Sequence, residues 1–145
     1  MPINKAANGR HVVRVERESV VEIPGDSGRV LGQTYYYGLY FHDDEVAQAW
    51  AMETFERSPG RGSQKGVTIN LYRDGSTTVM SFQGGKSDLG EKSRNGFEGS
   101  WEFIGGTGRF EGIVGGGDYS GESFEGIAYS NVSGNTSQSN DAGKP

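Results

Sequence analysis

Residues 103–115 read Phe-Ile-Gly-Gly-Thr-Gly-Arg-Phe-Glu-Gly-Ile-Val-Gly, a glycine-rich stretch that carries large apolar side chains. A chain that reverses direction here needs residues that tolerate positive φ, as glycine does. The glycines suited to this are Gly105, Gly106 and Gly108. Phe110 would then re-enter the core on the face used by Phe103. The stretch predicts two antiparallel strands joined by a hairpin loop at residues 104–109.

The residues before this loop alternate between aromatic and acidic side chains. Alternation with a period of two is typical of a half-buried strand, so one set faces the core and the other faces water. We expect Phe97, Trp101 and Phe103 to point inward and Glu98 and Glu102 to point outward. The same reasoning predicts further inward-facing residues on two other strands: Val67, Ile69, Leu71, Phe110, Gly112 and Val114.

Breaks that contain Gly, Asp or Pro recur about every ten residues, which is typical of many short strands. Residues 47–57 also suit a helix because Ala, Met and Glu favour helices, but we interpret them as a strand. Asp74-Gly75 suits a tight hairpin turn. The eight predicted strands are His11–Ile23, Val30–Phe41, Val46–Glu56, Val67–Tyr72, Thr77–Gln83, Gly96–Ile104, Phe110–Tyr119 and Phe124–Ser130.

A sheet of this size, with no helix to cover it, would leave two bare edges and an uncovered apolar face. Closure removes both problems, so we predict an all-β fold: a closed antiparallel eight-stranded β-barrel over residues 11–131. The polar residues 1–10 and 132–145 are expected to form a flexible N-terminal tail and a disordered C-terminal tail. An eight-stranded barrel is either filled by side chains or holds one small ligand.

Composition excludes several classes of function. The net charge of −5 repels a phosphate backbone, so we expect no nucleic-acid partner. The chain has no cysteine and only two histidines, without metal-site spacing; residues 42–45, His-Asp-Asp-Glu, fit a solvated turn better than a metal site. No apolar run approaches the roughly 20 residues of a membrane span. We expect no metal, cofactor or membrane insertion, and a soluble protein, cytoplasmic if Met1 is the native start.

Residues 103–115 resemble the strand–loop–strand signature of the allene oxide cyclase and dirigent barrels, which runs hydrophobic, Gly-Gly, Thr or Ser, Gly, any, Phe, any, Gly. The resemblance implies an eight-stranded, often oligomeric barrel that uses no metal or cofactor. It also implies a reactive apolar intermediate steered into one ring closure or coupling. No other stretch aligns residue by residue with these families, so none of their catalytic residues is transferred. We therefore expect a homo-oligomer, either a dimer or a trimer. A second reason is that the expected outer faces of two strands carry little charge: Thr68 and Asn70 on one, and Thr77, Val79 and Ser81 on the other.

Two residues are candidates for catalysis. If the predicted strand is regular, Glu53 and Glu56 lie on its opposite faces, and one of them points inward. The alternative is that neither is buried and both lie at the surface. A carboxylate inside an apolar barrel can serve as an acid, a base or a counter-charge. In the Tyr35-Tyr36-Tyr37 run, either Tyr36 alone or both of its neighbours face inward. We take Glu53 and Tyr36 as the catalytic candidates.

The candidates for ligand binding are mainly large apolar side chains, which either line a pocket or fill the core. They are Trp50, Trp101, Phe103, Tyr35, Tyr37, His42, Met52 and Met80. Residues 57–63 are expected to form a long loop of the kind that covers a barrel mouth.

The function we expect is a cofactor-independent isomerase or cyclase that acts on a small hydrophobic substrate inside the barrel. The alternative is a non-catalytic carrier of a small hydrophobic ligand, because lipocalin-like barrels show that the same architecture suffices for carriage. A third reading is a barrel filled by its own side chains and used for assembly.

Overall fold

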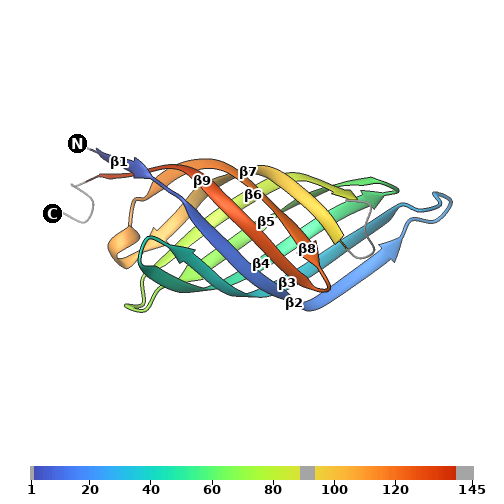
Figure 1. Ribbon diagram of the computed structural model, residues 1–145, viewed down its shortest axis with the longest axis horizontal. Coiled ribbons are helices and arrows are strands. Elements are labelled where there is room, and N and C mark those ends of the chain that lie inside the picture. Colours follow the sequence, from blue (N-terminus) through green and yellow to red (C-terminus); the bar gives the residue numbers. More distant parts are fainter. Residues whose placement is uncertain (1, 89–93, 140–145) are drawn as a thin grey trace.

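The computed structural model describes residues 2–88 and 94–139. This part of the chain contains nine β-strands and one short 3-10 helix, η1 (Figure 1). They are β1 (Pro2–Ala6), β2 (Gly9–Glu22), β3 (Val30–His42), β4 (Glu45–Ser58), β5 (Arg61–Leu71), β6 (Thr77–Asp88), β7 (Arg94–Thr107), η1 (Gly108–Phe110), β8 (Val114–Phe124) and β9 (Ile127–Ser139). None of its helical segments has the length and apolarity to cross a membrane.

The strands form a closed barrel. Each strand from β2 to β9 pairs antiparallel with the next one along the chain, and β9 also pairs with β2, which closes a ring of eight. The additional strand β1 pairs with the far end of β9 and thus continues the line of β2. The prediction of an all-β, eight-stranded antiparallel barrel is confirmed.

Both predicted tails differ from the structure. β1 covers part of the expected N-terminal tail, and β9 runs on to Ser139 instead of ending near residue 130. The polar composition of these segments was misleading because their backbones hydrogen-bond to each other, with pairs from Pro2↔Ser139 to Ala6↔Asn135. Residues 140–145 lie outside the described part of the chain.

Two predicted loops are also wrong. The expected long loop at 57–63 is a two-residue turn, Pro59-Gly60, because β4 and β5 pair as far as Ser58↔Arg61. The expected hairpin loop at 104–109 is shifted, because β7 continues to Thr107 and the reversal uses η1 and residues 111–113. Of the three glycines expected there at positive φ, only Gly108 has it, at 63°.

The ambiguous segment 47–57 lies in strand β4, as predicted. On β7 the predicted faces are also correct: Trp101 is buried, Phe97 and Phe103 pack against the core, and Glu98 and Glu102 are exposed.

On β5 the faces are reversed, since Thr68 and Asn70 are buried whereas Ile69 is 43% exposed. The interior accepts these polar residues because Asn70 Nδ2 donates to Thr78 Oγ1 at 3.0 Å. At the start of β8, Val114 is 56% exposed and does not face the core. Apolar character alone therefore did not identify the inner face.

Interior glycines make room for the aromatic rings of the core. A Cβ atom at Gly32 would lie 2.1 Å from Phe55 Cζ, and one at Gly66 would lie 2.7 Å from Phe82 Cζ. Tyr119 Oη occupies the corresponding space above Gly84 and Gly99. A ring on one strand thus lies over a glycine on a neighbouring strand, which lets large side chains fit inside a barrel of only eight strands.

We expect Gly84→Ala to destabilise the fold by about 1–3 kcal/mol, because its Cβ would lie 2.0 Å from Glu98 O and 2.6 Å from Tyr119 Oη. Gly85→Ala is the matched control, since its Cβ would meet nothing closer than Gly62 O at 3.5 Å. Urea unfolding of the two variants measures the difference. Equal midpoints would contradict this account of the interior glycines.

Candidate functional site

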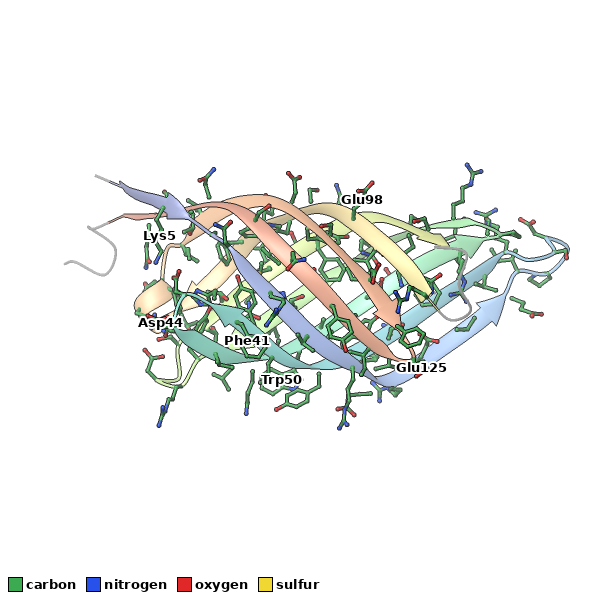
Figure 2. All side chains as sticks on the ribbon, in the orientation of Figure 1. Lys5, Phe41, Asp44, Trp50, Glu98 and Glu125 are labelled. Atoms are coloured by element: carbon green, nitrogen blue, oxygen red, sulfur yellow. The ribbon has the colours of Figure 1, made fainter. Side chains whose placement is uncertain are left out.

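The barrel contains a partly open cavity of about 90 Å³. Its walls are mostly apolar and come from strands all around the ring, whereas Trp50 and Glu98 project from the outer surface (Figure 2). The apolar lining includes Val13, Ala51, Met80, Phe82, Phe97, Trp101, Ala128 and Val132. The polar lining includes His11, Tyr36, Glu53, Gln64, Thr68, Lys86 and Tyr119.

A buried carboxylate is the most unusual feature of this cavity. Glu53 is only 2% exposed. Tyr36 Oη donates a hydrogen bond to Glu53 Oε2 at 2.8 Å, and Lys86 Nζ forms an ion pair with Oε1 at 3.0 Å. Acidic residues are rarely buried without such partners. The cavity therefore holds one carboxylate, one ammonium group and one phenol in direct contact.

Strand register brings these three groups together. Tyr36 lies on β3 opposite Ala51, two residues before Glu53 on β4, so both side chains enter the barrel on neighbouring strands. Lys86 reaches the same point from β6, with its ammonium group 4.9 Å from the centre of the Phe55 ring. Its side chain is 18% exposed. Three strands thus contribute one polar group each.

The environment keeps the phenol of Tyr36 protonated. Burial, the charge of Glu53 and the hydrogen bond to Glu53 all raise the pKa of Tyr36 far above its ordinary value. Tyr36 is therefore a hydrogen-bond donor at neutral pH, positioned next to a group that accepts protons. Such a pair can exchange protons with a bound molecule.

A second polar group lies on the cavity wall at His11. His11 Nε2 lies 3.0 Å from Asn70 Oδ1, and its ring stacks on Tyr40 at 4.1 Å. Burial lowers the pKa of His11 to about 4, so the imidazole is neutral at physiological pH. Burial likewise raises the pKa of Tyr40 to about 12.

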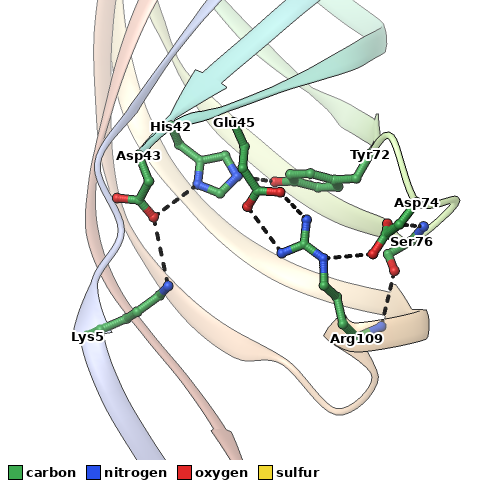
Figure 3. Close-up of polar contacts among 8 residues, drawn as sticks. All are labelled: Lys5, His42, Asp43, Glu45, Tyr72, Asp74, Ser76 and Arg109. Atoms are coloured by element: carbon green, nitrogen blue, oxygen red, sulfur yellow. Dashed lines mark hydrogen bonds and ion pairs between the residues drawn. The ribbon is translucent and has the colours of Figure 1, made fainter.

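The end of the barrel near η1 carries a network of polar contacts (Figure 3). Tyr72 Oη lies 2.6 Å from His42 Nε2, and Arg109 forms ion pairs with Glu45 and, at 3.0 Å, with Asp74. The backbone nitrogen of Arg109 donates to Ser76 Oγ. These contacts fasten η1 across this end of the barrel.

The run of possible metal ligands at residues 42–45 contributes to that network. His42 contacts Tyr72, Asp43 contacts Lys5 and Glu45 contacts Arg109 (Figure 3). Across residues 2–88 and 94–139, no group of three or more potential ligands is arranged to hold a metal ion.

The structure brings four of the predicted site residues together around the cavity: Tyr36, Glu53, Met80 and Trp101. Phe103 packs edge-on against Trp101, with 5.0 Å between ring centroids, without lining the cavity. His42 lies near η1, away from the cavity wall.

The other four predicted ligand-binding residues do not face the interior: Tyr35, Tyr37, Trp50 and Met52. Side chains alternate along a strand, so an inward Tyr36 turns both of its neighbours outward, and an inward Glu53 does the same to Met52. On the outside, the Arg17 guanidinium lies 4.2 Å from the centre of the Tyr35 ring, and Gln33 Nε2 donates to Met52 Sδ at 3.4 Å.

Together they belong to an outer apolar face on β3, β4 and β5. We define this face by Tyr35, Tyr37, Leu39, Trp50, Met52, Val67, Ile69 and Leu71. The register places Trp50, which is 40% exposed, between Tyr37 and Ile69. The Tyr37 and Trp50 rings lie 5.3 Å apart. None of the eight residues is charged.

Sequence reasoning missed Lys86 and His11 as site residues. The strand predicted at residues 77–83 was too short, because β6 continues to Asp88. Every second residue of this strand faces inward, so the series that begins with Met80 and Phe82 reaches Lys86. His11 lies two residues before Val13 on the same strand, so an inward-facing Val13 would have predicted an inward-facing His11. Both residues line the cavity.

Comparison with models of known protein families finds no match for this chain. A search among curated proteins finds no similar sequence.

We expect the buried imidazole of His11 to make stability depend on pH. The unfolded chain binds a proton near the ordinary pKa of 6.5, whereas the folded chain binds it only near pH 4. The contribution of His11 to the free energy of unfolding is therefore complete above pH 6.5 and is lost as the pH falls toward 4. The loss amounts to about 2–3 kcal/mol at pH 4.5.

Urea unfolding of the wild type and His11→Gln at pH 7 and pH 4.5 measures this contribution. The variant should lose less stability than the wild type, because glutamine does not titrate. The carboxylates that titrate in the same range affect both proteins alike. A parallel loss in the two proteins would contradict the neutral, buried state of His11.

Proposed function

We propose that this protein is a cofactor-independent isomerase or cyclase that acts on a small, uncharged, largely apolar substrate inside the barrel. The observation that carries the proposal is the buried Glu53 carboxylate, in contact with Tyr36 and Lys86 on the wall of a mostly apolar cavity. Buried titratable groups with specific partners in a cavity are typical of functional sites.

The proposed chemistry is a proton transfer within the bound substrate. A Glu53 oxygen accepts a proton from one carbon of the substrate, and a substrate carbonyl oxygen accepts hydrogen bonds from Tyr36 and Lys86 as negative charge develops on it. The protonated Glu53 then returns the proton to another carbon, which moves the double bond and regenerates the carboxylate. No co-reactant is consumed.

The charge and size of the cavity narrow the substrate class. Glu53 and Lys86 neutralise each other, so an uncharged molecule enters without leaving an unpaired charge. About 90 Å³ is less than the roughly 150 Å³ of an apolar cavity that holds benzene. A compact ring or a short chain therefore fits within this cavity, whereas a longer ligand would extend into the larger pocket that shares Lys86 and Tyr119 with it.

The same apolar walls would suit a carrier, the alternative function. A carrier gains nothing from an ion pair in its binding cavity, because desolvating two charges costs free energy. The Glu53–Lys86 pair is thus the reason to favour catalysis over carriage.

We expect the protein to isomerise 3-cyclopentenone, a small β,γ-unsaturated ketone, to its conjugated isomer. Glu53→Gln should lower the rate at least 100-fold because it removes the proton acceptor, and Tyr36→Phe should lower it because it removes a donor. The ultraviolet absorbance of the conjugated product measures the rate. Glu98→Gln is the matched control, since Glu98 lies on the outer surface.

The double variant Glu53→Gln/Lys86→Met guards against misfolding, because it leaves no unpaired ammonium group in the interior. It should fold and be inactive. Wild-type protein that yields only the rate of buffer would contradict the proposed activity. Activity that survives in Glu53→Gln would contradict the role of this carboxylate.

We further propose that the outer apolar face binds a second copy of the chain. The chain has a net charge of −5, so two copies repel each other at most charged surfaces, whereas this face contributes no charge. Uncovered apolar faces on strands are typical of association surfaces.

Trp50→Glu should therefore dissociate the oligomer, because it places a charge at the centre of the outer apolar face. Val114→Glu is the control, since Val114 is exposed on β8, outside this face. Size-exclusion chromatography with light scattering reads the mass directly. A wild-type mass near 15.6 kDa would contradict self-association.

A further inference from the structure

Lys86 differs from the other described lysines in its position inside the barrel. Among residues 2–88 and 94–139 it is the one lysine that lines the small cavity, and it also lines the larger pocket. Its side chain is 18% exposed, whereas Lys5 and Lys65 are exposed residues. A small molecule in either space can therefore reach the amine of Lys86.

Two glycines on β5 let this side chain reach Glu53. Strand β5 lies between β4 and β6, and its residues paired with Glu53 and with Lys86 are Gly66 and Gly62. At these two positions no side chain stands between the lysine stem and the carboxylate. The Lys86 amine thus ends 3.0 Å from Glu53 Oε1 and 4.9 Å from the centre of the Phe55 ring.

The carboxylate oxygen next to this amine has room for a further proton donor. Glu53 Oε2 accepts the hydrogen bond of Tyr36, but within the described part of the chain Oε1 is buried and accepts no hydrogen bond. Buried acceptors without a hydrogen bond are rare in folded proteins and cost free energy. Oε1 therefore lies where it can take a proton from the Lys86 amine or from a bound molecule.

We propose that Lys86 is a nucleophile that captures small aldehydes and ketones in the cavity as iminium ions. A lysine amine adds to a carbonyl carbon when a neighbouring group takes its proton and its surroundings are largely apolar. Glu53 meets the first condition, and the rings of Phe55 and Phe97 beside Lys86 meet the second. The inference deepens the proposed function and rests on it in assigning the cavity to small carbonyl compounds.

Protons and bonds balance in this capture. The Lys86 ammonium gives one proton to Glu53, and the free amine bonds through Nζ to the carbonyl carbon as the carbon–oxygen double bond opens. A second amine proton moves to the oxygen, which gives a neutral carbinolamine. Glu53 then returns its proton to this hydroxyl group, the carbon–oxygen bond breaks and water leaves. The products are an iminium ion on Lys86, an ionised Glu53 and one water molecule.

The charges of the site are the same before and after capture. The iminium ion keeps the positive charge of Lys86 next to Glu53, so no buried charge is left without a partner. An iminium ion also withdraws electrons from the adjacent carbon more strongly than a carbonyl group does. Capture would thus make a proton on that carbon easier for Glu53 to remove, which is the step that the proposed isomerisation begins with.

The test treats the full chain with propanal and sodium cyanoborohydride, which reduces an iminium ion to a stable secondary amine. Peptide mass spectrometry then measures how fast each lysine gains a propyl group. We expect Lys86 to be alkylated at least tenfold faster than Lys65, which lines the larger pocket but not the small cavity. In guanidinium chloride, which unfolds the chain, the two lysines should react alike.

Three variants assign the chemistry to these groups. Glu53→Gln should slow alkylation of Lys86 at least tenfold and leave Lys65 unchanged, because glutamine cannot return the proton that expels water. Lys86→Arg keeps a positive charge against Glu53 but has no amine, so the fast alkylation should disappear. Glu98→Gln is the matched control on the outer surface and should alkylate like the wild type.

Alkylation of Lys86 at the rate of Lys65 in the folded protein would overturn the proposal, and so would an unchanged rate at Lys86 in Glu53→Gln. The isomerisation assay uses neither aldehyde nor reductant, so the two proposals can fail separately. Isomerisation without fast alkylation would leave Lys86 as a hydrogen-bond donor only and overturn the capture. Fast alkylation without isomerisation would support the capture and contradict the proposed function.

Discussion

The narrow interior of an eight-stranded barrel is the constraint on which the rest of the structure depends. Several large rings occupy it where a neighbouring strand presents a glycine, as Phe55 does over Gly32 and Phe82 over Gly66. Among these rings a partly open cavity of about 90 Å³ remains, beside a larger pocket whose lining includes Phe55, Lys86 and Tyr119. The positions of these glycines therefore help to determine where large rings fit inside the barrel.

Within that space, the free energy of burial governs which polar groups are present. An isolated carboxylate in such surroundings would be strongly destabilising, so Glu53 is buried together with Lys86 and Tyr36. An apolar residue of similar size would fill the same volume without an ion pair. That a charged pair occupies it is the main physical reason for the chemical role that we propose for the interior.

Much of the fold could be predicted from local patterns, whereas the site could be predicted only in part. Turn residues and alternation predicted eight strands and the inward faces of β7, but the inward face of β5 was assigned to Ile69 although Asn70 occupies it. Apolar side chains were assumed to face inward, yet this barrel has apolar residues on both sides of its wall. For the same reason Trp50 was placed in the ligand site when it lies on the outer apolar face.

The sequence alone determined that this is a closed all-β barrel, because alternation, turn spacing and the absence of any covering helix are local properties of the chain. It also singled out Glu53 and Tyr36 as candidates. Only the tertiary structure decided that they touch and that Lys86 completes the group. The physical reason is register: which residues of β3, β4 and β6 share the interior depends on how strands far apart in the sequence align, and single-strand patterns carry no record of that alignment.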